Sequence, residues 1–176
     1  MINQLTTILP PPSRRTFDHA VWAAFETKEK LRLPKDFQEL IAIYGAGQID
    51  EFLWVLNPFS TNRNLNFDKS RYFQEAYAAM QQEFRSDYPR PFYPAKGSFF
   101  SWAVTDNGGT FFWLVDGEPD AWKVAIHSSD QGEEEFYDSG CVELLLNILR
   151  RDISSSILPP QFPPANVEVH VFKAVD

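Results

Sequence analysis

Apolar residues recur with helical spacing in four stretches of the chain. The clearest stretch begins at Leu33-Pro34 and ends at Gly45, with apolar side chains at i, i+3, i+4 and i+7 (Phe37, Leu40, Ile41, Tyr44). Proline near the first turn and glycine just past the last turn are typical helix boundaries. A helix before it is expected to have Thr16 as its cap, followed by apolar positions at helical spacing (Phe17, Ala20, Val21, Ala24).

Two further helices follow from the same periodicity. One starts after the Asn66 or Asp68 cap and ends before Pro89, with its stripe at Phe73, Ala76, Tyr77, Met80 and Phe84. The last is expected to be capped by Ser139, with its stripe at Val142, Leu145, Leu146, Leu149 and Ile153. The leucine-rich stripe predicts that this helix packs on a sheet.

Strands are predicted over residues 48–59 and 92–137, where short aromatic and branched segments alternate with turn-forming residues. The first region holds one or two strands. The second holds four, over 99–104, 110–115, 122–127 and 133–137, separated by turns at 106–109, 116–120 and 128–132. Strands joined by such short turns form an antiparallel meander.

The prolines divide the chain into three parts. An N-terminal arm covers residues 1–15, a folded domain covers 16–153, and a proline-rich extension covers 154–176 with an edge strand over 167–172. Because strands and helices are segregated along the chain, we expect an α+β fold. Its mainly antiparallel mixed sheet carries about four helices, packed largely on one face.

Composition narrows the class of protein. The 176 residues are 44% hydrophobic, with one cysteine and a net charge of −8. A single cysteine cannot form an internal disulfide, and the first residues show no secretion signal, so we expect a cytoplasmic protein. No apolar run is long enough for a membrane span. The negative charge argues against nucleic-acid binding, which rests on lysine and arginine.

The whole net charge falls between Asp116 and Glu143, where nine acidic residues face Lys123 alone. Such a segment predicts an acidic face that steers a basic protein partner, although acidic loops also serve solubility alone. The candidate partner-binding residues are Asp116, Glu118, Asp120, Trp122, Asp130, Glu133, Glu134, Glu135 and Asp138. Trp122 is the candidate aromatic anchor. Its alternative position is in the core, under the last helix.

Residues suited to catalysis are few. The three histidines are scattered, and Cys141 has no second cysteine beside it, so neither a zinc site nor another metal or cofactor site is predicted. His127, Ser128 and Asp130 stand too close in one turn to assemble a catalytic triad. A hydrolase that uses Asp106, Asp116 or His127 is the least favoured hypothesis.

Two stretches carry a family resemblance. Residues 33–47 contain a Leu-Pro-x-x-aromatic helix that ends in a glycine turn. The second set consists of Trp102 to Gly109, Phe112-Trp113, Gly117, Trp122-Lys123-Val124, Tyr137 and Ser139 with the leucine helix. In order and spacing, from about Thr16 to Ile153, both resemble the SUKH superfamily, which includes the yeast Smi/Knr cell-wall regulators. The insert at 63–93 and the proline-rich tail exceed the family's minimum.

The resemblance implies a mixed α+β fold without an active site. It further implies an immunity protein that binds and neutralises a toxin, often a nuclease, and hence a partner with a basic toxin domain. The alternative is a regulatory scaffold or adaptor of the Smi/Knr type. We expect the chain to be a monomer or a weak homodimer.

Overall fold

The structure is a computed structural model that describes residues 1–13, 20–91, 93–128 and 132–175. The helices are α1 (Ile2–Ile8), α2 (Ala20–Glu29), α3 (Lys35–Tyr44), α4 (Phe67–Glu83) and α5 (Cys141–Leu149), with a 3-10 turn η1 (Pro119–Ala121). The strands are β1 (Gly47–Ile49), β2 (Leu53–Val55), β3 (Ser98–Thr105), β4 (Thr110–Val115), β5 (Lys123–His127), β6 (Glu134–Tyr137) and β7 (Phe172–Ala174). No helix in the described part of the chain is long and apolar enough to cross a membrane.

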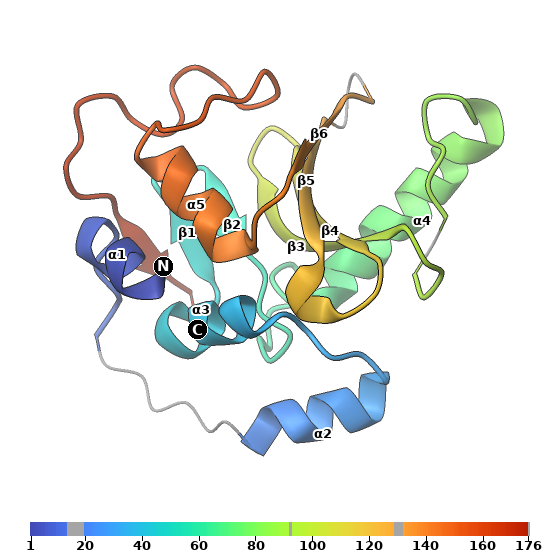
Figure 1. The fold of residues 1–176 in the computed structure, drawn as a ribbon, viewed down its shortest axis with the longest axis horizontal. Coiled ribbons are helices and arrows are strands. Elements are labelled where there is room, and N and C mark those ends of the chain that lie inside the picture. The colour runs from blue at the N-terminus through green and yellow to red at the C-terminus, as the bar shows by residue number, and fades with distance from the viewer. Residues whose placement is uncertain (14–19, 92, 129–131, 176) are drawn as a thin grey trace.

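The described strands form a single sheet of seven, in the order β6-β5-β4-β3-β2-β1-β7 (Figure 1). Every neighbouring pair is antiparallel. Strands β3 to β6 follow one another as the predicted meander, and β1 and β2 form a hairpin within residues 48–59, with Gly47 added at its start. The α+β class predicted from the sequence is confirmed.

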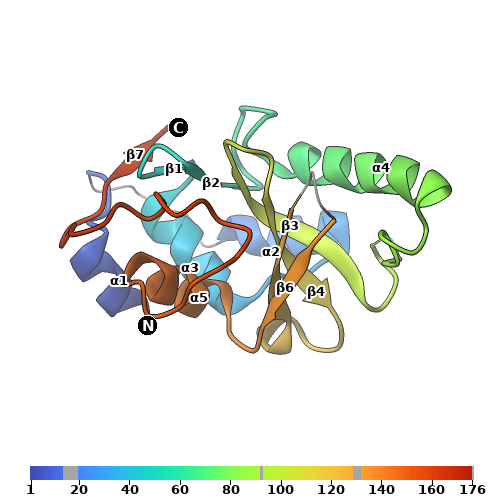
Figure 2. The same cartoon turned by 90° about the horizontal axis from the view of Figure 1, so that it is seen from above.

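Helices lie on both faces of this sheet (Figures 1 and 2). On one face, side chains of α1, α3 and α5 pack with Trp102, Trp113 and Val124 in the larger core. The other face holds a smaller core, where Tyr77 of α4 contacts Phe99 and its strand neighbours. Side chains alternate across a strand, so the two cores lie on opposite faces. Helix α2 contributes a buried tryptophan to the larger core as well. Four helices thus pack into the core on one face, as expected, and α4 covers part of the other face.

Helix α4 also covers an edge left open inside the sheet. Strand β2 pairs with β3 only over residues 103–105, so the earlier part of β3 has no strand on that side. The Ser70 hydroxyl of α4 accepts a hydrogen bond from the Ser101 amide at 3.1 Å. Gln74 donates to the carbonyl of Phe99 at 3.3 Å. Helix side chains thereby satisfy backbone groups that a longer β2 would have paired.

The start of α5 differs from the prediction. Its N-cap is Gly140, and Ser139 is not the cap. Instead, a carboxylate oxygen of Asp36 in α3 accepts from the Val142 amide at 3.2 Å. A Cβ on Gly140 would overlap this carboxylate, so glycine is the residue that permits the approach. The prediction was wrong because the acceptor comes from a helix about a hundred residues earlier in the chain, a contact that local spacing cannot reveal.

The N-terminal region contains a helix that the sequence pattern did not predict. Helix α1 buries Leu5 and Leu9 completely, and the Tyr44 hydroxyl donates to the carbonyl of Leu9 at 2.6 Å. Seven residues are too few for a clear period, and such a helix gains its stability from packing. For the next helix, α2, Thr16 and Phe17 lie outside the described residues; its described part begins at Ala20.

The C-terminal segment closes the sheet beside β1, but the strand is shorter than predicted and shares only one residue with the predicted range. The expected range was 167–172, whereas β7 begins at Phe172. Just before it, Nδ1 of His170 lies 2.6 Å from the Asp50 carboxylate, and Nε2 lies 3.0 Å from the Leu149 carbonyl. The His170 amide donates to the carbonyl of Ile8. These contacts hold residue 170 out of the β1 ladder, so regular pairing starts only after it.

Candidate partner-binding surface

The β5–β6 hairpin separates the predicted acidic residues into two groups. One group lies around η1 and at the end of β6 (Asp116, Glu118, Asp120, Asp138), and the other at the start of β6 (Glu133, Glu134, Glu135). Glu134 pairs with His127 at the far end of β5. At the rise of an extended strand, Glu134 and Asp138 are about 13 Å apart. Asp130 lies outside the described residues.

Each acidic side chain of the η1 group has a cationic partner. Asp116 lies 3.1 Å from Lys96, Glu118 lies 2.6 Å from Arg32, and Asp120 lies 3.5 Å from Lys35. Asp138 is paired with Lys123. Four carboxylates and four cations therefore sum to zero net charge at this end of the hairpin. Exposed pairs of this kind contribute little stability, and their fields largely cancel at a distance.

The β6 group keeps a negative charge. Arg90 is the cation paired with Glu134, at 3.0 Å. The Glu133 side chain is exposed and makes no ion pair with any described residue. Glu135 instead accepts hydrogen bonds from neutral groups, including the Ser156 amide at 2.7 Å and the Tyr137 hydroxyl at 2.8 Å. Three carboxylates and one cation leave a net charge of −2 at the start of β6.

Glu135 is held in its charged form. Burial by itself would raise the pKa of this carboxyl, but hydrogen bonds from Ser155, Ser156 and Tyr137 outweigh it and keep the pKa below the ordinary value. Burial and the adjacent carboxylate together raise the pKa of Tyr137, which remains a donor. The negative charge of Glu135 is therefore a permanent feature of β6 near neutral pH.

The aromatic side chain beside this charge is Phe136, and not Trp122. Trp122 is only 6% exposed, and its indole donates to the Gly117 carbonyl at 3.2 Å. It packs near Trp113 in the larger core, so it has no surface to offer a partner. Phe136 is 44% exposed. The Arg90 guanidinium lies 4.8 Å from its ring and 5.3 Å from that of Phe99.

A sequence signal for Phe136 existed but was weak. It follows three consecutive glutamates in the sequence, and its side chain points to the α4 face, whereas that of the next aromatic residue, Tyr137, points to the opposite face. Burial statistics favoured Trp122 for the core, as the structure shows. The alternation of side chains along a strand would have indicated Phe136 as a partner-binding residue only if the edge position of β6 had been known.

The residues considered for hydrolysis have structural roles. Asp106 accepts from the Trp54 indole at 2.6 Å and from Gln48 at 3.3 Å. His127 is 6% exposed and burial lowers its pKa; its ring lies among those of Tyr77, Tyr88 and Phe112. Asp116 is in the ion pair with Lys96. No hydrogen bond joins these three candidates in the described chain, nor do three potential metal ligands cluster there.

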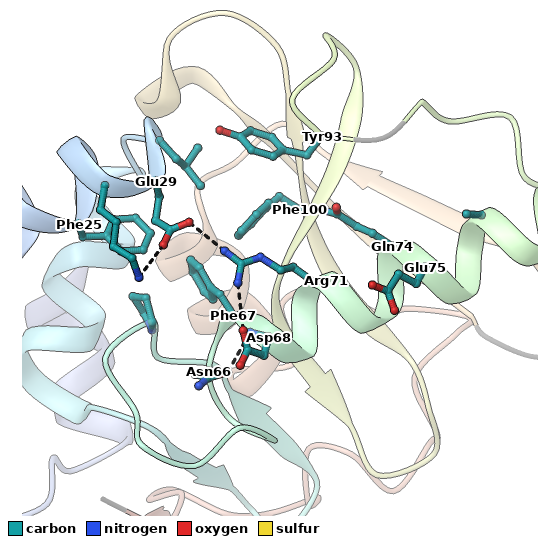
Figure 3. Close-up of a pocket in the computed structure, with 14 residues that line it drawn as sticks. Phe25, Glu29, Asn66, Phe67, Asp68, Arg71, Gln74, Glu75, Tyr93 and Phe100 are labelled. Carbon is teal, nitrogen blue, oxygen red and sulfur yellow. Dashed lines mark hydrogen bonds and ion pairs between the residues drawn. The ribbon is translucent and has the colours of Figure 1, made fainter.

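A cleft of about 600 Å³ opens between α2 and α4 (Figure 3). Its apolar walls include Phe25, Phe67 and Phe100. Across it, Arg71 donates to Glu29 at 2.8 Å and to Asp68 at 3.0 Å. Both ends of the guanidinium are therefore occupied by carboxylates. The cleft has the size of a ligand site, but its arginine is already neutralised and is not free to bind an anion.

A second hollow, of about 450 Å³, lies on the part of the sheet that α4 leaves uncovered. It is lined by Trp54 and Val104 of the sheet, Phe73 of α4 and Val175. Beside it, Lys69 lies 5.1 Å from the ring of Tyr72, which is 59% exposed. Met80 and Phe84, at the far end of α4, are exposed as well. This surface offers a second place for contact with another protein.

Comparison with known proteins places the chain in a family. The model of the SUKH_6 family, described as SMI1-KNR4 cell-wall, matches residues 20–145. The match starts at the first described residue of α2 and ends within α5, so it spans the cleft, the meander and β6. No curated protein and no solved structure matches the chain. Because the family model covers well over half of the sequence, this chain belongs to the SUKH_6 family of SMI1-KNR4 proteins.

Proposed function

We propose that the chain is a non-enzymatic immunity protein that neutralises a protein toxin by binding a basic surface of that toxin. Family membership supports a protein-binding module of the immunity or regulatory kind. The proposal of a basic toxin surface as the partner is supported by the negative charge that remains at the start of β6, where Glu133 has no counterion among the described residues. A toxin that cleaves nucleic acid has a cationic cleft, and an acidic strand would occupy it in place of phosphate.

We place the proposed contact at one end of the acidic segment, because the charge that remains after folding differs between its two ends. The η1 group is neutralised by Arg32, Lys35, Lys96 and Lys123, so it adds little to a long-range field. The β6 group retains its charge and has an exposed aromatic ring beside it. Aromatic residues and arginine are enriched at the energetically important centres of interfaces, and here Arg90 lies against the ring of Phe136. We therefore assign the toxin contact to residues 133–136.

A charge reversal at one exposed residue tests this proposal. The candidate toxin is the product of a neighbouring open reading frame, and its affinity for the full chain is measured by calorimetry at two salt concentrations. Glu133→Lys is expected to weaken binding about tenfold or more and to reduce the salt dependence. Glu118→Lys is the matched control, because it makes the same change of charge at the neutralised end.

Equal affinity of the two variants would show that the charge at β6 does not determine toxin binding. A second readout is protection of cells that express the toxin. Glu133→Lys should lose protection while Glu118→Lys retains it. A chain that binds no neighbouring toxin and gives no protection would contradict the immunity function itself.

The second candidate function is a regulatory scaffold that docks on other cellular proteins. The apolar surface of α4 favours it, because Tyr72, Met80 and Phe84 are exposed without a partner element in the described structure. Tyr72→Ala with Met80→Ala would abolish binding of such a partner. The same pair of changes should leave toxin binding unaltered, which separates the two functions.

A further inference from the structure

Strand β6 is the outermost strand on its side of the sheet. Its ladder with β5 fixes which backbone groups face outward. The Ser128 amide donates to the carbonyl of Glu133 at 2.9 Å, so that pair is a hydrogen-bonded one. In an antiparallel ladder bonded and non-bonded pairs alternate. Glu134 and Phe136 are therefore non-bonded to β5, and their amides and carbonyls point away from the sheet.

These outward groups have no partner within the described chain. No backbone or side-chain hydrogen bond to the main chain of Glu134 or Phe136 is present on the outer side. The segment around Ser156 lies close to β6, but its hydrogen bonds go to the side-chain carboxylate of Glu135. Two amides and two carbonyls are thus free to pair with an added strand.

The side chains of β6 specify what kind of strand would fit. Phe136 projects to the α4 face, where Arg90 stacks on its ring and bonds Glu134. Glu133 and Glu135 project to the other face. An added strand would meet an apolar ring on one face and two carboxylates on the other. The segment that would complement these side chains is extended and alternates apolar and basic residues.

A second copy of the chain is a poor occupant of this edge. Two β6 strands paired with each other would bring glutamates opposite glutamates, which is destabilising. Acidic residues on an open edge strand are a common means of preventing such self-association. The charge that disfavours a second β6 strand favours a basic one.

We propose that β6 accepts an extended, basic segment of a partner protein as an additional strand of the sheet. The proposal rests on the proposed function only for the identity of the partner as a toxin. It adds that the main chain of the partner, and not its side chains alone, is bound. Recognition then depends on alternation of basic and apolar residues in the partner segment.

Synthetic peptides test the pairing without altering the protein. The probe is an acetylated, amidated peptide of seven residues that alternates lysine and valine. Two analogues carry backbone N-methyl groups, one on all valines and the other on all lysines. Each analogue blocks hydrogen bonding along one edge of the peptide only. One of the two analogues should bind the full chain about tenfold more weakly than the probe, and the other about equally.

Hydrogen exchange of the full chain gives an independent readout. The amides of Glu134 and Phe136 should exchange rapidly in the free chain and become protected when the probe is bound. A peptide that alternates glutamate and valine should give no protection. Equal affinities of the two methylated analogues, or unchanged exchange at both amides, would overturn the proposal. Dimers of the free chain in sedimentation velocity, with these amides already protected, would also overturn it.

These outcomes are separable from the proposed function. If Glu133→Lys weakens toxin binding while toxin and probe leave both amides unprotected, the immunity function stands and strand addition is wrong. If the probe protects both amides while no toxin binds, strand addition stands and the immunity function is wrong.

Discussion

Replacing His170 with alanine is expected to lower the free energy of unfolding by about 3–5 kcal/mol. The His170 and Asp50 side chains are only 2% and 4% exposed, so water cannot compensate either group. Removing the side chain that contacts a buried carboxylate costs an amount in this range because the carboxylate loses its partner. The change also leaves the carbonyl of Leu149 without its donor. Urea denaturation followed by circular dichroism measures the loss.

Asp50→Asn is the matched control for this prediction. The asparagine oxygen can still accept from the Val171 amide, and its NH₂ group can donate to Nδ1 while Nε2 donates to Leu149. All the hydrogen bonds at the site are then kept, so we expect a loss of only about 1 kcal/mol. Val169→Ala, at an exposed neighbouring position, measures how much stability is lost by truncating a side chain that is not buried. A cost for His170→Ala no larger than that of Val169→Ala would refute the reasoning.

Three further results are expected. Asp36→Ala should cost about 1–2 kcal/mol, because α5 loses its capping acceptor, while the exposed Asp152→Ala changes the melting temperature little. Ser70→Ala should cost about 1–3 kcal/mol in urea denaturation, because the buried amide of Ser101 is left unsatisfied. Burial lowers the pKa of His127, so the unfolded chain takes up the proton first and stability should fall as pH drops below 6.5. This fall should be smaller in His127→Phe, as judged by denaturation at several pH values.

Much of the fold could be predicted because local patterns and tertiary structure agree. The stripe of Phe37, Leu40, Ile41 and Tyr44 predicts α3, and all four side chains are buried. The Asn66 cap of α4 is also confirmed, with its side chain accepting from the Asp68 amide at 2.8 Å. Turn residues between short apolar segments were sufficient to predict the four strands of the meander.

The candidate surface could be predicted only in part, because linear charge does not determine where charge remains after folding. Arg32, Lys35 and Lys96 lie far from the acidic segment in sequence, yet they neutralise three of its carboxylates. The same kind of long-range contact places Asp36 at the start of α5. Trp122 stands among charged residues in the sequence, but the turn before it directs the indole into the core.

The pairing of β7 with β1 has a consequence for biosynthesis. Residues 172–174 are the last of the sheet to leave the ribosome, and until they arrive the outer side of β1 has no neighbour on the nascent polypeptide. The hydrogen bond from His170 to Ile8 likewise joins a late segment to the first helix. Cotranslational folding can therefore complete the meander early but cannot close the sheet. During that interval the unpaired edge of β1 is exposed to pairing with other chains.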